Sequence, residues 1–159
     1  MKEIKYYEPS DIEIRSKDGE MVLREKSLIA FSQNDKKILA IGADAEKMAL
    51  QNMDGVLVFS PLRRGMIADY LVAVHMFRHM IQKTWGKKLF SKPRIAVFAP
   101  EDMTEVERKA LMDAMFQAGA KDLLIGEGSP VRFRADMMAA DNKQYLSYDL
   151  FIVITPEMN

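Results

Sequence analysis

The sequence predicts a mixed α/β fold. The first third of the chain is made of short alternating apolar and polar segments separated by turn residues, a pattern typical of antiparallel strands. The rest alternates apolar, strand-like runs with helical stretches, a pattern typical of strand–helix units. Of the 159 residues, 48% are apolar, which is enough for the core of a single domain.

The first third contains two predicted hairpins, then a helix and a further strand. Asp18-Gly19 is a hairpin turn signal, and Asn34-Asp35 marks the second turn. Asp54-Gly55 turns the chain into the last strand of this region. In chain order, the predicted elements are strands at 11–15, 20–25, 27–32 and 36–42, a helix at 43–52 and a strand at 56–60.

Two longer helices follow, each with defined start and stop signals. Asp69 is a candidate N-cap for a helix to about Lys83, which Gly86 ends. Thr104 and Glu107 form a capping box for the next helix, and Gly119 is its C-cap. The predicted buried stripes are Leu71, Val74, Phe77 or Arg78, and Ile81 on the first helix, and Val106, Ala110, Leu111, Ala114, Met115 and Ala118 on the second. Buried strands are predicted at 94–100, 121–126 and 148–155, and a weak helix or a loop at 130–142.

Composition excludes several classes of function. Lysine and arginine balance aspartate and glutamate, so the formal net charge of zero argues against nucleic acid as the main partner and permits self-association. The absence of cysteine excludes disulfides, thiolate chemistry and cysteine zinc sites. The first ten residues do not read as a signal peptide, and the apolar runs are too short to span a bilayer. We therefore expect a cytoplasmic protein.

A few polar side chains are candidate ligand sites. His75 and His79 lie four apart on one helix face, a spacing that can hold a metal, but no carboxylate matches them on that helix, and a solvated face is favoured. Tyr6 and Tyr7 dock on the surface or bind a partner, and the sequence does not choose between these. A basic cluster could contact acidic lipid or a partner, or it is simply a solvated helix end. The overall charge balance favours the solvated helix end. The cluster comprises Arg78, Lys83, Lys87, Lys88, Lys92 and Arg94.

Three blocks of sequence resemble a known family. "PLRRGMIADY" (61–70), "KPRIAVFAP" (92–100) and "TEVERKALMDAMFQAGAKDLLIGE" (104–127) are similar to the bacterial actin homologue MreB, the rod-shape-determining family. The resemblance covers roughly residues 11–128 in one collinear register. It implies that residues 1–159 form a single lobe of an actin-like, ribonuclease H-like ATPase fold. That lobe would contain a mixed sheet of about five strands, flanking helices and a small inserted subdomain at 28–60.

The family's first strand is central in this lobe, and this sequence has no counterpart to it near its start. The apolar run 149–154 fits a strand that is covered on both faces. We therefore predict that 149–154 occupies the central position, parallel to 94–98.

The resemblance also implies two glycine-rich phosphate loops, and the matching positions here contain no glycine. "YYEPSDIEIR" stands near the first loop and "YDLFIVITPEMN" near the second. A phosphate cradle needs glycines so that backbone N–H groups can approach the oxygens. Glu127 aligns with the family's glutamate that positions the attacking water, and we interpret it as a relic. We expect no catalytic residue, no bound cofactor and no metal, and we give little weight to 126–129 as a small phosphate nest.

The first functional hypothesis is a non-catalytic, MreB-like domain that acts through protein contacts in cell-shape or cytoskeletal assembly. Its partner would be a second copy or a full-length actin-like protein, bound through the face near Glu127 or through 28–60. The alternative is a residual nucleotide-binding ATPase that a partner chain completes. A repurposed fold with its own ligand is a third reading.

Overall fold

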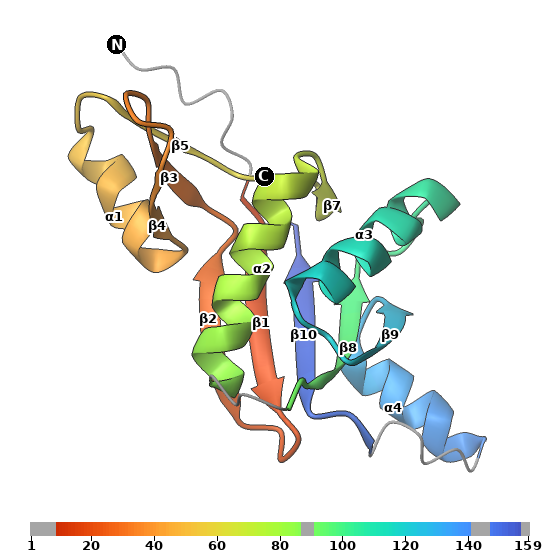
Figure 1. Ribbon diagram of the computed structural model, residues 1–159. Helices are drawn as coiled ribbons and strands as arrows, with labels where there is room; N and C mark the ends of the chain where they lie inside the picture. Colours follow the sequence, from red (N-terminus) through yellow and green to blue (C-terminus); the bar gives the residue numbers. More distant parts are fainter. Residues whose placement is uncertain (1–8, 87–90, 141–146, 157–159) are drawn as a thin grey trace.

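The computed structural model of the chain describes residues 9–86, 91–140 and 147–156 (Figure 1). Tyr6, Tyr7, Lys87 and Lys88 lie outside these residues. The elements in chain order are β1 (Asp11–Ser16), β2 (Met21–Lys26), β3 (Ile29–Ser32), β4 (Ile38–Ile41), α1 (Ala43–Gln51), β5 (Val56–Phe59), β6 (Leu62–Arg63), β7 (Met66–Ile67), α2 (Tyr70–Trp85), β8 (Arg94–Ala99), α3 (Glu105–Ala118), β9 (Asp122–Glu127), α4 (Pro130–Ala139) and β10 (Leu150–Thr155).

The main sheet has five strands, in the order β2-β1-β10-β8-β9. The last strand, β10, therefore lies in the centre, where it pairs antiparallel with β1 and parallel with β8. Leu150, Ile152 and Ile154 are each at most 3% exposed, as expected for alternate residues of a covered strand. The prediction that the end of the chain fills the central position, parallel to 94–98, is confirmed.

Helices cover both faces of this sheet (Figure 1). On one face, Phe77 of α2 and Met115 of α3 pack with Ile95 and Val97 of β8 and with Ile152 of β10. On the other face, Ala96 and Phe98 of β8 form a smaller cluster with Tyr148 and with Phe133 of α4. Alternate residues of β8 thus enter different layers, which explains why the sequence of this strand is apolar throughout.

Residues 28–60 contain a second sheet and α1 (Figure 1). The strand order is β4-β3-β5, with both pairings antiparallel. Leu28, Ala30 and Ala45 form a small core between this sheet and α1, while Ile29 belongs to the main core. The boundaries of an inserted subdomain at 28–60 stay a prediction.

The two chain segments that lead into and out of this region are joined by serine hydrogen bonds. The Oγ atoms of Ser27 and Ser60 lie 2.9 Å apart. The backbone N–H of Ser10 donates to Ser27 Oγ at 2.8 Å, and the N–H of Ser27 donates to the carbonyl of Ser10. These three serines fix the point at which β1, β2 and the exit from β5 meet.

A buried carboxylate holds α1 against β2. The side chain of Glu25 is 8% exposed, and its Oε1 lies 3.2 Å from Nζ of Lys83 on α2. The N–H of Ala43, the first residue of α1, donates to the same oxygen at 3.4 Å. The N-cap of α1 is Gly42, which has no side chain to cap the helix. Glu25 therefore supplies the negative charge that a helix N-terminus favours.

Several details differ from the sequence predictions. Leu71 and Val106 are 71% and 79% exposed, although both were expected in buried stripes. Leu71 shares its side of α2 with the exposed His75, and Val106 shares its side of α3 with the exposed Lys109 and Asp113, so neither faces the core. The strand at β9 was predicted to be fully buried, but it lies at the edge of the sheet, so Leu123 and Leu124 are only half-buried. The short hairpin of β6 and β7 was not predicted.

Other details agree with them. Asp69 caps α2 by accepting from the N–H of Val72, and the capping box of Thr104 and Glu107 is present at the start of α3. Within the described residues, no helix combines the length and the apolar character that crossing a bilayer requires.

Candidate functional site

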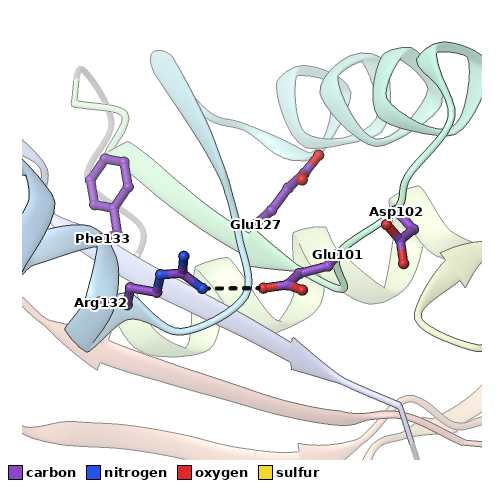
Figure 2. Close-up of a pocket in the computed structure, with 5 residues that line it drawn as sticks. All are labelled: Glu101, Asp102, Glu127, Arg132 and Phe133. Carbon is purple, nitrogen blue, oxygen red and sulfur yellow. Dashed lines mark ion pairs between the residues drawn. The ribbon is translucent and has the colours of Figure 1, made fainter.

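The candidate site lies at one edge of the main sheet. Because β10, β8 and β9 are mutually parallel, their carboxyl ends meet there. Glu127 is the last residue of β9, and Glu101 and Asp102 directly follow β8. Together with Arg132 and Phe133 of α4, they line a pocket of about 320 Å³ (Figure 2).

The turn after β8 places the first two of these carboxylates. Asp102 has a left-handed backbone with φ of 70°, a conformation that aspartate adopts more readily than most residues. The chain then enters α3 at once, with Thr104 as N-cap. Glu101 and Asp102 are both exposed, so neither is a buried group held in a fixed position.

Glu127 is paired only loosely. Its Oε1 lies 3.9 Å from Nη1 of Arg108, and both side chains are 44% exposed. Another nitrogen of Arg108 donates to the carbonyl of Ile125 at 3.3 Å. Arg132 points toward Glu101 instead, at 3.9 Å (Figure 2). Exposed pairs of this kind contribute about 0–1 kcal/mol, so they do not lock the pocket into one arrangement.

The two glycines around Glu127 have structural roles. A Cβ on Gly126 would lie 2.8 Å from the ring of Phe98, its partner in the β8–β9 register. Gly128 has φ of 79°, and a Cβ there would lie 3.0 Å from Oε1 of Glu101. The N–H of Gly128 already donates to the carbonyl of Ala99 at 2.9 Å. The N–H of Gly128 is therefore used within the sheet, and the group beside it is the carboxylate of Glu127.

The carboxyl end of β10 is in contact with the β6–β7 turn. Gly65, in that turn, packs so closely on Pro100 that a Cβ would lie 2.6 Å from the proline Cγ and 3.7 Å from a methyl of Ile154. Past Ile154, the chain continues as Thr155 and Pro156. The central strand therefore ends against packed side chains and a proline.

The remaining predicted sites lie elsewhere. His75 and His79 are on α2 and do not line this pocket. The described part of the chain has no cluster of three or more histidine, cysteine or acidic side chains that could hold a metal ion. Members of the basic cluster have separate roles: Lys83 pairs with Glu25, and Arg94 pairs with Asp122 at 2.9 Å. The hydrogen bond from Arg94, followed by that from the N–H of Leu123, holds the pKa of Asp122 below its ordinary value.

Comparison with known proteins places the fold. The family model described as MreB/Mbl protein matches residues 10–133. The chain belongs to the MreB/Mbl family. It is 36% identical over 118 residues to the cell shape-determining protein Mbl of Bacillus subtilis and 30% identical over 135 residues to MreB of Escherichia coli. These matches cover 74% and 76% of this chain but 35% and 39% of those relatives, so the chain spans little more than a third of their length.

Solved structures give the same assignment. MreB5 of Spiroplasma citri bound to ADP superposes with a TM-score of 0.64 at 25% identity, over 74% of this chain and 35% of that one. The MamK double helical filament superposes with a TM-score of 0.63 at 15% identity, over 76% of this chain and 38% of that one, which supports the fold alone. The chain is therefore an MreB/actin-like lobe with a mixed five-stranded sheet, and the sequence resemblance is confirmed.

Sequence reasoning identified Glu127 but not the residues around it. Glu101, Asp102 and Arg132 carried no motif. Their common signal is that they immediately follow, or lie shortly after, the ends of parallel strands, where ligands of α/β sheets usually bind.

Proposed function

We propose that this MreB/Mbl-family lobe is non-catalytic and acts in the cytoplasm through protein contacts in cytoskeletal assembly. The observation that carries the proposal is the identity of the central strand. β10 fills the centre of the sheet and ends in Thr155 and Pro156, beside Pro100 and the Gly65 turn. The central strand therefore leads into a proline, not into a glycine loop that could wrap a phosphate.

The charges at this edge support the same proposal. A nucleotide phosphate requires free N–H donors, cations or a bound Mg²⁺. The pocket instead contains Glu101, Asp102 and Glu127, opposed by the exposed side chain of Arg132. Three carboxylates repel a polyphosphate, and the N–H of Gly128 is occupied by Ala99.

Two exposed apolar surfaces are suited to protein contacts. We define the α3 stripe as the exposed apolar side chains of that helix, Val106, Met112 and Phe116, which are 79%, 38% and 41% exposed; Met112 and Phe116 lie one turn apart. The second surface belongs to the 28–60 region, where Leu39, Leu50 and Met53 are 47%, 82% and 43% exposed. Exposed apolar clusters are typical of interaction sites. α3 also carries Arg108, which pairs with Glu127 and lies one turn before Met112, so Met112 is on the side of α3 that faces this residue.

The partner in this proposal is a second copy of the chain or a longer actin-like protein. One structural neighbour, MamK, is a double helical filament, and the relatives Mbl and MreB are cell shape-determining proteins. We propose these partners because the chain is similar to those proteins and because the α3 stripe is exposed.

The alternative is a nucleotide-binding ATPase that a partner chain completes. It is favoured by one observation, the retention of Glu127 at the carboxyl edge. Equilibrium dialysis of ATP with Mg²⁺ separates the two functions. We expect no saturable binding at physiological ATP, whether the chain is dilute or concentrated enough to self-associate. Mg²⁺-dependent binding in the micromolar range would support the alternative.

A further inference from the structure

The strand β9 is the outermost strand on one side of the main sheet, and β8 is its only strand neighbour among the described residues (Figure 1). It pairs with β8 in unbroken parallel register from Asp122 to Glu127. A regular edge strand of this kind has backbone groups that can bond to a strand of another molecule. The free side of β9, which we call the β9 edge, is therefore a possible docking surface.

Alternate residues of β9 direct their backbone groups away from β8. The N–H and the C=O of Arg94 are both bonded to Asp149, on the β10 side of β8. The next residue of β8 therefore faces β9, and so does every second residue up to Ala99, whose C=O accepts from the N–H of Gly128. The even-numbered residues of β9 thus bond to β8, and the odd-numbered residues point out of the sheet.

Two of the outward-pointing groups are bonded to charged side chains. The N–H of Leu123 donates to Oδ1 of Asp122 at 2.9 Å. The C=O of Ile125 accepts from a guanidinium nitrogen of Arg108, on α3, at 3.3 Å. Both charged residues are exposed, so a second strand could bond to these groups only after displacing the two side chains.

The two covered groups would be each other's partners in a pair of β9 strands from two copies. If the strands ran antiparallel with Leu124 of each copy opposite the other, the N–H of Leu123 in one copy would face the C=O of Ile125 in the second. In the same register, the exposed Lys121 would lie opposite Glu127 of the second copy. Opposite charges on facing residues stabilise a strand pair, so the β9 edge is complementary to itself.

This match depends on the register. A shift of one residue would place the outward-pointing residues of one strand opposite residues that are bonded to β8 in the other copy. It would also place Asp122 opposite Glu127, and like charges on facing residues destabilise a strand pair. The charges therefore favour the register centred on Leu124.

We propose that Arg108 and Asp122 close the β9 edge against pairing with a second copy of the chain. Their two hydrogen bonds form an autoinhibitory contact, because each one occupies a backbone group that the second strand requires. In a symmetric pair of copies each contact occurs twice, so the loss of one side chain acts twice on the association. The inference goes beyond the proposed function, because it holds whether or not the chain binds a filament.

Removal of Arg108 should open the β9 edge. Arg108→Ala should strengthen self-association about tenfold or more in sedimentation equilibrium, because the C=O of Ile125 is released in both copies. Amide hydrogen exchange at the N–H of Ile125 should also slow as the variant associates. Lys109→Ala, at the next and equally exposed position of α3, is the matched control and should associate like the unaltered chain.

Charge reversal then identifies the surface that associates. In the Arg108→Ala variant, Lys121→Glu should return association to the level of the unaltered chain, because it places two glutamates opposite each other. Adding Glu127→Lys to that variant should restore the pair. In the chain that retains Arg108, Lys121→Glu alone should change association by less than about twofold.

Three results would overturn the inference. The first is an Arg108→Ala variant that is folded by circular dichroism and associates no more strongly than the unaltered chain. The second is association of this variant that Lys121→Glu leaves unchanged, and the third is association of the unaltered chain that Lys121→Glu weakens. If Arg108→Ala does not fold, Asp122→Ala carries the same test, because it releases the N–H of Leu123. Binding to filaments, which tests the proposed function, is measured separately with the unaltered chain.

Discussion

Ile152 in β10 lies directly opposite Ile14 in β1, in the antiparallel pair at the centre of the main sheet. On its other side, Ile152 is in register with Val97 of β8. All three side chains are fully buried. The last strand of the chain therefore joins the antiparallel half of the sheet to its parallel half.

The first prediction follows from that position. Ile152→Ala should lower the free energy of unfolding by about 2–5 kcal/mol, because it leaves a cavity in a packed core. Ile152→Asp should prevent folding, because it buries a charge without a partner. Urea denaturation measures the first change and circular dichroism the second. Thr155→Ala, an exposed position at the end of the same strand, is the control. An Asp variant that folds normally would mean that β10 does not occupy the centre.

The second prediction concerns the joint between α1 and β2. Gly42 has φ of 70°, and a Cβ there would lie 2.6 Å from Oε2 of Glu25, a buried oxygen with no hydrogen-bond partner among the described residues. Gly42→Ala should therefore displace Glu25 from the start of α1.

Gly55→Ala is the matched control for this variant. Gly55 has φ of 74°, and a Cβ added there would meet no other atom within 4 Å. Gly55→Ala should lower the free energy of unfolding by about 1–2 kcal/mol, the cost of a left-handed backbone for alanine. Gly42→Ala should lower it further and should increase hydrogen exchange at the N–H of Ala43. Equal losses in the two variants would argue against the role given to Glu25.

The third prediction concerns Glu127. Glu127→Ala should change the free energy of unfolding by no more than about 0.5 kcal/mol, because its exposed pair with Arg108 contributes little. Association with partners should also stay nearly unchanged. Thermal and urea denaturation measure the first effect, and a loss of several kcal/mol would reveal a structural role for this carboxylate.

Much of the fold could be predicted because local signals and burial agree. The run at β8 is apolar after its first residue, and it is covered on both faces. The capping box at Thr104 fixed the start of α3. The central place of β10 followed from its apolar run together with the family's topology, since a run like that of residues 150–154 needs cover on both faces.

Other features depend on contacts that no local pattern records. Leu71 and Val106 are apolar and were assigned to the core-facing stripes, but the side chains that are buried show that the core faces another side of each helix. Gly126 resembled part of a phosphate nest, and the structure instead explains it by the ring of Phe98. Arg132 lines the site because α4 packs against β9. The weak helical pattern of residues 130–142 did not predict where that helix would pack.

The most direct measurement is co-sedimentation of the chain with filaments of a full-length MreB-family protein. We expect the chain to pellet with the filaments. Val106→Asp and Phe116→Asp should each weaken this association about tenfold or more, as expected for apolar anchors of an interface. Leu71→Asp is the matched control, a similarly exposed apolar residue on α2. A chain that stays in the supernatant and also sediments as a strict monomer at high concentration would contradict the proposed function.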